Sequence, residues 1–240
     1  MIVNQRGFFE GIAMKIIAKI KTDFPTKFGI PRQSGLVEEL KGTVIFEPEY
    51  RTPEALIGLE DFSHIWLLWE FSEAVSDGKW SPTVRPPKLG GNKRKGVFAT
   101  RSPFRPNSIG LSSVKLDSIE YTEKYGAVLH VSGVDLMDGT PIVDIKPYIP
   151  YADCHNDATG GFSVDGTMSK WFCVNFPDEL KKKVPAEKLS ALIKVLELDP
   201  RPAYHDDPER IYGFGFAGME IKFKVYESIL TVSDISEYNF

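Results

Sequence analysis

Apolar residues in the first 150 positions come in short runs separated by Pro, Gly and polar residues, a spacing typical of strands. The runs that indicate strands lie at residues 14–21, 42–46, 62–71, 111–121, 127–134 and 141–146. The run at 62–71 is apolar at nearly every position, so we expect it to be buried on both faces. Thr52 and Pro53 have the residue types of an N-cap and a first helical position, which predicts a short helix there. Many short strands with few helices predict a closed or nearly closed β-barrel.

The pattern changes after Tyr151. Residues 155–165 are polar and Gly-rich, as a linker would be. Apolar positions between 177 and 198 recur close to every 3.6 residues and predict one or two helices, and alternation over 210–226 predicts a strand. We therefore expect a barrel domain at 14–157 and a small α+β domain at 158–240. Residues 1–13, which precede Met14, are either a disordered extension or a mis-assigned start.

Composition narrows the class of protein. Apolar residues make up 42% of the chain, which is ample for a packed core. The longest apolar stretch, residues 65–69, is too short to span a membrane, and no signal peptide is evident. The two cysteines, Cys154 and Cys173, and the scattered histidines do not have the spacing of a zinc site, so we expect no metal. These features predict a cytoplasmic protein with free thiols.

Positive charge is concentrated in one segment, residues 79–105. It holds eight Lys and Arg residues and no Asp or Glu, although the whole chain carries a net charge of −4. Trp80, Phe98 and Phe104 are interleaved with the cations. Cations that bind phosphates, next to rings that stack on bases, are what single-stranded RNA recognition requires. The alternative is a solvated basic loop that only keeps the protein soluble, and composition does not separate the two.

Two further segments have residues suited to ligand binding. At 101–107, two prolines restrict the backbone around Arg101 and Arg105, whose planar guanidinium groups suit carboxylates or phosphates. Residues 135–141 place two acids, Asp135 and Asp138, around an Asp-Gly turn. Such acids can bind a cation or ribose hydroxyls, although Asp-Gly is also a common hairpin turn.

Several strings, taken together and in order, resemble the TsaA-like family of tRNA methyltransferases. They are PRQSGL at 31–36, GLEDFSHIW at 58–66, RPP at 85–87, GVFATRSPFRPN at 96–107, DGTP at 138–141 and DIKPY at 144–148. DPRPAY at 199–204 resembles the additional C-terminal domain of bacterial members. The resemblance implies a mainly β, α+β fold, with a small single-sheeted β-barrel and a small α+β C-terminal appendage. It also implies a homodimer.

The same resemblance implies a function and a set of site residues. Family members bind S-adenosylmethionine (S-adenosyl-L-methionine) and methylate N6 of threonylcarbamoyladenosine at position 37, in the anticodon loop of tRNA. A Gly-x-Gly-x-x-Gly loop is absent here, which fits a cofactor site unlike that of Rossmann methyltransferases. The cofactor-binding residues carried over from the family are Pro31, Arg32, Gln33, Ser72, Glu73, Arg101, Leu111, Asp135, Leu136, Met137 and Asp138. Ser72-Glu73 stands where some relatives have His-Gln, so the sequence departs from the family at this pair.

Methyl transfer requires positioning more than charge stabilisation, so we expect no metal ion in the reaction. A carboxylate that accepts the proton of the attacking nitrogen is optional, and the candidates are Asp138 and Glu73. We assign RNA binding to Lys93, Arg94, Lys95, Phe104 and Arg105; the arginines Arg94 and Arg105 suit either the threonine carboxylate or a phosphate. An S-adenosylmethionine- or RNA-binding module without catalysis is the alternative. The catalytic interpretation requires the basic segment, residues 31–33 and residues 135–138 to share one cavity.

Overall fold

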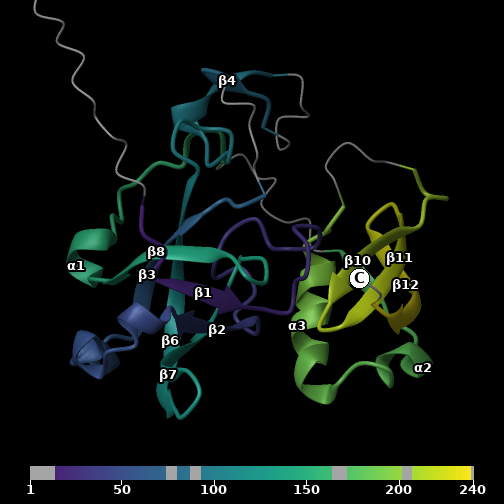
Figure 1. Cartoon of the computed structure of the whole chain (residues 1–240). Coiled ribbons are helices and arrows are strands. Elements are labelled where there is room, and N and C mark those ends of the chain that lie inside the picture. Colours follow the sequence, from purple (N-terminus) through teal and green to yellow (C-terminus); the bar gives the residue numbers. More distant parts are fainter. Residues whose placement is uncertain (1–13, 74–79, 87–92, 164–171, 202–206, 239–240) are drawn as a thin grey trace, which may run out of the picture.

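The computed structural model describes residues 14–73, 80–86, 93–163, 172–201 and 207–238. Figure 1 shows a β-barrel on one side and a smaller sheet with helices, built from the C-terminal residues, on the other. Nowhere in these ranges is a helix both long and apolar enough to cross a membrane. The expectation for residues 1–13 falls outside the described ranges.

Six strands of the described chain close into the barrel in the order β1-β2-β7-β6-β3-β8, with every neighbouring pair antiparallel. Their bounds are β1 Ala18–Lys21, β2 Lys41–Phe46, β3 His64–Glu70, β6 Ile109–Thr122, β7 Gly126–Ser132 and β8 Pro141–Pro147. Closure occurs because β1 pairs with both β2 and β8. The predicted small β-barrel is therefore confirmed.

Strand β3 shows where the hydrophobic pattern was misleading. Ile65, Leu67 and Trp69 are buried inside the barrel, whereas Trp66 and Leu68 are only half-buried on its outer face. The indole of Trp66 donates a hydrogen bond to Asp153 (3.0 Å) on that outer side. The expectation of burial on both faces was wrong, because a barrel of one sheet packs only its inner face. The first strand also begins later than expected, at Ala18 rather than Met14.

The Asp-Gly turn does not join a hairpin. Strands β7 and β8, which flank it in sequence, are not neighbours in the barrel. Gly139 has a φ of 77°, and its N–H donates to the carbonyl of Ile20 (2.8 Å) on β1. Residues 133–140 therefore cross the end of the barrel before β8 begins. This crossing segment carries the acids singled out above.

The region between β3 and β6 is mostly irregular. It includes a two-stranded ribbon, β4 (Thr83–Val84) with β5 (Lys95–Gly96), and a 3-10 helix at Val97–Ala99. Elsewhere before residue 164, the described residues also form 3-10 helices at Pro48–Tyr50, Pro53–Leu56, Leu59–Asp61 and Gly161–Ser163, and the short helix α1 at Pro150–Asp153. The helix predicted after Thr52 is a 3-10 helix, and the Thr52 side chain makes no cap hydrogen bond.

The C-terminal part is a four-stranded sheet in the order β10-β11-β12-β9. Its elements are β9 Cys173–Asn175, α2 Asp178–Lys181, α3 Ala186–Glu197, β10 Tyr212–Phe216, β11 Met219–Tyr226 and β12 Ile229–Glu237. The helical prediction is confirmed as two helices, and the predicted strand is a hairpin that turns at Ala217 and Gly218, both at positive φ. Strands β9 and β12 were not predicted.

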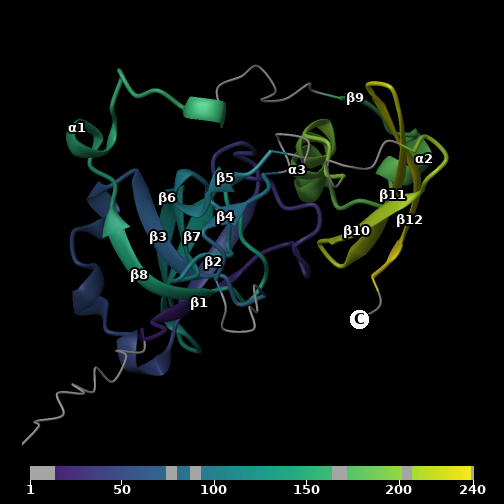
Figure 2. The same cartoon turned by 90° about the horizontal axis from the view of Figure 1, so that it is seen from above.

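Helix α3 lies between the barrel and the C-terminal sheet in both views (Figures 1 and 2). Its buried residues, Ala191, Leu192, Val195 and Leu196, form one apolar stripe. A single apolar cluster runs through both parts of the chain, and it includes Phe24 before β2 and Phe216 on β10. The two parts therefore share a core.

Candidate active site

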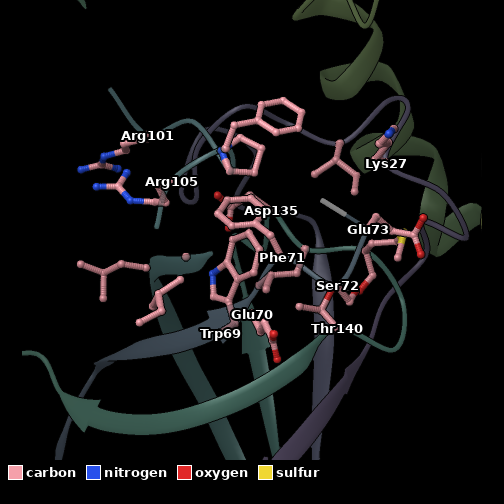
Figure 3. A pocket seen from close by; sticks show the side chains of 18 of the residues that line it. Lys27, Trp69, Glu70, Phe71, Ser72, Glu73, Arg101, Arg105, Asp135 and Thr140 are labelled. Atoms are coloured by element: carbon pink, nitrogen blue, oxygen red, sulfur yellow. Dashed lines mark hydrogen bonds between the residues drawn. The ribbon is translucent and has the colours of Figure 1, made fainter. Parts of the chain in front are cut away.

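A cavity of about 970 Å³ opens at one end of the barrel, and Figure 3 shows many of its side chains. Four segments line it: the loop before β2, the end of β3 with the residues after it, the basic segment up to β6, and the crossing segment 133–140. Its lining residues are Lys27, Ile30, Pro31, Arg32, Gln33, Trp69, Glu70, Phe71, Ser72, Glu73, Phe98, Thr100, Arg101, Pro103, Phe104, Arg105, Pro106, Asn107, Ile109, Gly110, Leu111, Asp135, Leu136, Met137 and Thr140.

Trp69 forms one wall of this cavity, and its position depends on Gly110. The two residues pair across β3 and β6, and a Cβ at residue 110 would lie 2.2 Å from the indole ring. Glycine is therefore required for the ring to lie flat against β6. The ring of Phe71 packs on Trp69 with a centroid distance of 4.2 Å. Together they give an apolar, aromatic surface suited to a planar base.

A hydrogen-bond chain leads from this wall to Asp135. The indole N–H of Trp69 donates to Ser112 Oγ (3.0 Å), and the Ser112 hydroxyl donates to Asp135 Oδ1 (2.6 Å). Because an indole N–H can only donate, the single hydroxyl proton of Ser112 is directed to the carboxylate. The chain fixes Asp135 near the middle of the cavity in Figure 3.

Burial raises the pKa of Asp135 to about 6. The hydroxyl of Ser112, the backbone amides of Asp135 and Ser34, and the charge of Arg101 act in the opposite direction but do not offset desolvation. A carboxyl group with this pKa can take up and release a proton near neutral pH, which is the property required of a general base.

The basic segment meets the first loop at the cavity mouth. The guanidinium group of Arg101 donates a hydrogen bond to the side-chain oxygen of Gln33, and the Gln33 amide donates to the carbonyl of Arg32. Arg105 lies on the same side as Arg101 in Figure 3 and donates to the carbonyl of Thr100 (3.1 Å). Residues 31–33, Arg101, residues 103–105 and residues 135–137 therefore line one cavity, whereas Asp138, which the catalytic interpretation also placed there, does not.

Asp138 is the predicted cofactor residue that the structure places outside the cavity lining. Its Oδ1 accepts the backbone N–H of Thr22 (3.0 Å), and its own N–H donates to the carbonyl of Phe24 (2.8 Å). The side chain thus fixes the crossing segment to the loop after β1. Glu73, the other candidate base, lines the cavity but is exposed, as is Ser72.

The predicted RNA-binding residues divide into two groups. Phe104 and Arg105 line the cavity, whereas Lys93, Arg94 and Lys95 lie outside its lining, on and beside β5. Arg94 donates to Thr83 Oγ1 (3.1 Å), and Lys95 lies over the ring of Phe162. Lys79 and Lys88 of the basic segment fall outside the described residues.

Exposed aromatic rings lie at the cavity, where Phe98 and Phe104 belong to the lining, and beside it, where Trp80 contacts Phe98. Phe98 is 72% exposed, Phe104 is 55% exposed and Trp80 is 50% exposed. The rings of Trp80 and Phe98 lie 6.1 Å apart. Large rings left open to solvent beside arginines match the requirement for stacking on unpaired bases.

Sequence reasoning missed the residues that build the cavity wall. Trp69, Gly110 and Ser112 were not singled out, and neither was Phe71. One signal was present: Ser112 stands at an inward position of a strand whose other inward residues, Val114 and Leu116, are apolar. A buried polar residue in such a pattern needs a partner, and here that partner is Asp135.

The cavity fits the cofactor that the resemblance implies. Its volume lies at the upper end of the roughly 300–1,000 Å³ of small-molecule sites, which leaves room for a second ligand beside the cofactor. The described lining offers an aromatic wall for an adenine ring, Asp135 for a cationic or hydroxyl group, and Arg101 with Gln33 for polar contacts. These groups match the mixed character of a charged nucleoside.

Comparison with known proteins gives the family. The N-terminal domain of tRNA-methyltransferase O matches residues 19–154, and the TrmO C-terminal domain matches residues 171–238. A tRNA (adenine(37)-N6)-methyltransferase of Escherichia coli (strain K12) is 40% identical over 220 residues, covering 88% of this chain and 92% of that protein.

A curated sequence and a solved structure from Pseudomonas aeruginosa are also similar. A protein named "Putative S-adenosylmethionine-dependent methyltransferase RcsF" is 42% identical over 213 residues, covering 85% of this chain and 89% of its own length. The crystal structure of TrmO from the same species superposes with a TM-score of 0.75 at 33% identity, covering 94% of this chain and 97% of that one. The sequence match over both domains and the shared architecture place this chain in the tRNA-methyltransferase O (TrmO) family.

Proposed function

We propose that this protein is an S-adenosylmethionine-dependent tRNA methyltransferase that methylates N6 of threonylcarbamoyladenosine at position 37. One observation carries the proposal: the cavity that would hold the cofactor is also lined by Phe104 and Arg105 of the basic segment. Cofactor and nucleoside would therefore meet in one site. Family membership and the names of the relatives support the same reaction.

Within the site, the chain's own residues would supply position. The bound cofactor carries the methyl group on a sulfonium centre. We place the cofactor in the space lined by residues 31–33, Arg101 and residues 135–137. Ser72, Glu73 and Leu111 line the same cavity. Holding donor and acceptor about 3–3.5 Å apart and in line supplies much of the rate acceleration. The aromatic wall of Trp69 and Phe71 would restrict both ligands to such an arrangement.

Asp135 is the carboxylate best suited to accept the proton of the attacking nitrogen. It is fixed by Ser112 within the cavity, and its pKa of about 6 leaves it ionised at neutral pH. Glu73 remains the alternative, since it lines the same cavity. Asp138 is less suited because its carboxylate already accepts a hydrogen bond from Thr22.

The cavity mouth supports the proposed RNA contacts. Bases of an anticodon loop are unpaired, so turning the target adenosine into the cavity costs little. We assign Phe104 to stacking and Arg105 to the threonine carboxylate or a phosphate, with Lys93, Arg94 and Lys95 along the backbone of the RNA. A tRNA substrate also implies a cytoplasmic location.

A homodimer is the proposed assembly. It follows from the family resemblance, and Leu111 gives it some support. This residue lines the cavity yet is 50% exposed on the outside of β6. A second copy placed against this face would cover Leu111 and narrow the open side of the cavity.

The decisive experiment uses purified full-length protein, S-adenosylmethionine with a labelled methyl group, and tRNA that carries threonylcarbamoyladenosine. Mass spectrometry of the nucleosides should show one added methyl group on that nucleoside, and tRNA without the threonylcarbamoyl group serves as the control. Cofactor and tRNA binding without any methylated nucleoside would instead indicate a binding module.

A further inference from the structure

The loop at residues 22–33, called here the cofactor loop, runs between the barrel and the C-terminal sheet before it reaches the cavity. Its first contact with the C-terminal part is an ion pair. Lys188 Nζ on α3 lies 2.8 and 2.7 Å from the two carboxylate oxygens of Asp23. Their side chains are only 28% and 15% exposed, so the pair is partly shielded from solvent. The backbone carbonyl of Asp23 also accepts the N–H of Ala217 (2.8 Å), in the turn between β10 and β11.

Beyond Asp23, two aromatic rings of β10 contact the loop as it approaches the cavity. Phe24, which is fully buried, packs edge-on against Phe216 at 5.3 Å. Further along, Phe28 contacts Phe214 at 6.3 Å. Gly29 has a φ of 90°, and a Cβ there would lie 2.4 Å from the ring of Phe214. The ring therefore defines the path of the backbone at the residue before Ile30, where the cavity lining resumes.

The opposite side of the same loop is held by the crossing segment of the barrel. Thr22 Oγ1 donates to the carbonyl of Leu136 (3.0 Å), and the carbonyl of Phe24 accepts the N–H of Asp138 (2.8 Å). The loop is thus clamped between the C-terminal sheet and residues 136–138. Residues 30–33, which follow the clamped part of the loop, line the cavity, and so do residues 135–137 of the crossing segment.

We propose that the C-terminal part of the chain, through α3 and β10, positions the cofactor loop, and that Lys188 and Phe214 are positioning residues for S-adenosylmethionine. Neither residue lines the cavity. Lys188 contacts the loop at Asp23, near its start, and Phe214 contacts it at Phe28 and Gly29, directly before Ile30 of the lining. Loss of these contacts leaves residues 30–33 with more conformations, so the cofactor binds a less populated arrangement and its affinity falls. The inference rests on the proposed placement of the cofactor beside residues 31–33.

The first test compares two lysines of α3. Lys188→Met removes the contact to the loop, whereas Lys194→Met removes an ion pair with Glu197 (3.6 Å) on the same helix. Titration calorimetry with S-adenosylmethionine alone, without RNA, should show roughly 3- to 30-fold weaker binding for Lys188→Met. Lys194→Met should bind as the wild type does. Restoration by the exchanged pair, Asp23→Lys with Lys188→Asp, would identify the ion pair as the cause.

A second pair of variants separates positioning from general destabilisation. Phe214→Leu changes the strand that contacts the loop, and Leu230→Ala changes β12, which is separated from β10 by β11. Both should lower the melting temperature, but only Phe214→Leu should weaken cofactor binding, and its kcat at saturating cofactor should fall less than its affinity. Cofactor affinity within twofold of the wild type for folded Lys188→Met and Phe214→Leu would overturn the inference. Absence of cofactor binding by the wild type would instead contradict the proposed function.

Discussion

Arg101 links the two loops at the cavity mouth through one hydrogen bond to Gln33. It is exposed, so its replacement should leave the fold intact. We expect Arg101→Ala to reduce kcat/KM by about 100-fold or more, because misplacement of a site loop by about 1 Å costs that much. Arg101→Lys should be intermediate, since lysine keeps the charge without the planar fork. The methylation assay measures the rates, and unchanged turnover of a folded Arg101→Ala protein would contradict the assignment.

Asp135 connects the chemistry of the site to stability. Its folded-state pKa of about 6 exceeds the ordinary value of 3.8, so the folded protein binds the proton more tightly than the unfolded chain does. The protonated carboxyl group of Asp135 therefore contributes its full share of the folding stability below about pH 4, and this contribution is lost as the pH rises from about 4 through about 6. At neutral pH the loss amounts to about 3 kcal/mol.

Asp135→Asn removes this penalty, because an amide is not ionised at any of these pH values. We expect the variant to be more stable than the wild type at pH 7.5, by up to about 3 kcal/mol, and to show little difference at pH 4. Urea unfolding at both pH values measures the difference in the free energy of unfolding. The same difference at both values would show that Asp135 does not titrate in this window. The variant should also lose methylation activity if Asp135 accepts the proton.

At the scale of elements, the basic segment with β4, β5 and the 3-10 helix at Val97–Ala99 forms the proposed RNA surface. Each phosphate neutralised steepens the dependence of log K on log salt by about 0.7–0.9. Lys93→Ala with Arg94→Ala should therefore reduce the slope for tRNA binding by about 1.4–1.8. Filter binding over a range of salt concentrations checks this. Lys15→Ala with Lys19→Ala, on and before β1, is the matched control, and an equal reduction there would show that the segment has no special role.

At the scale of the whole molecule, the barrel and the C-terminal sheet share one apolar cluster. Phe24 of the cofactor loop is buried against Phe216 of β10, so neither part can open without exposing apolar surface of the other. We expect a single cooperative transition in differential scanning calorimetry, with equal calorimetric and van't Hoff enthalpies. Two separated transitions would contradict a shared core.

The sequence by itself determined most of the local structure and the family of this protein. The strands of the barrel follow from β-branched runs, and α3 follows from its apolar period, because these patterns are local. The strings around Pro31, Arg101 and Asp138 identified the family, and the charge distribution located the basic segment. Most of the residues assigned to the cofactor also line one cavity.

Only the tertiary structure decided which residues do what in that cavity. No feature of the sequence distinguishes the role of Asp135 from that of Asp138. In the folded protein, Asp135 is desolvated beside Ser112, whereas Asp138 accepts a hydrogen bond from the backbone of Thr22, because barrel closure brings different partners to each. The contact of Lys188 with Asp23 joins residues 165 positions apart, and no local pattern encodes such a pair. A side chain's pKa and role depend on the neighbours that long-range packing brings to it. The hydrophobic periodicity of a sequence describes local structure and does not specify those neighbours.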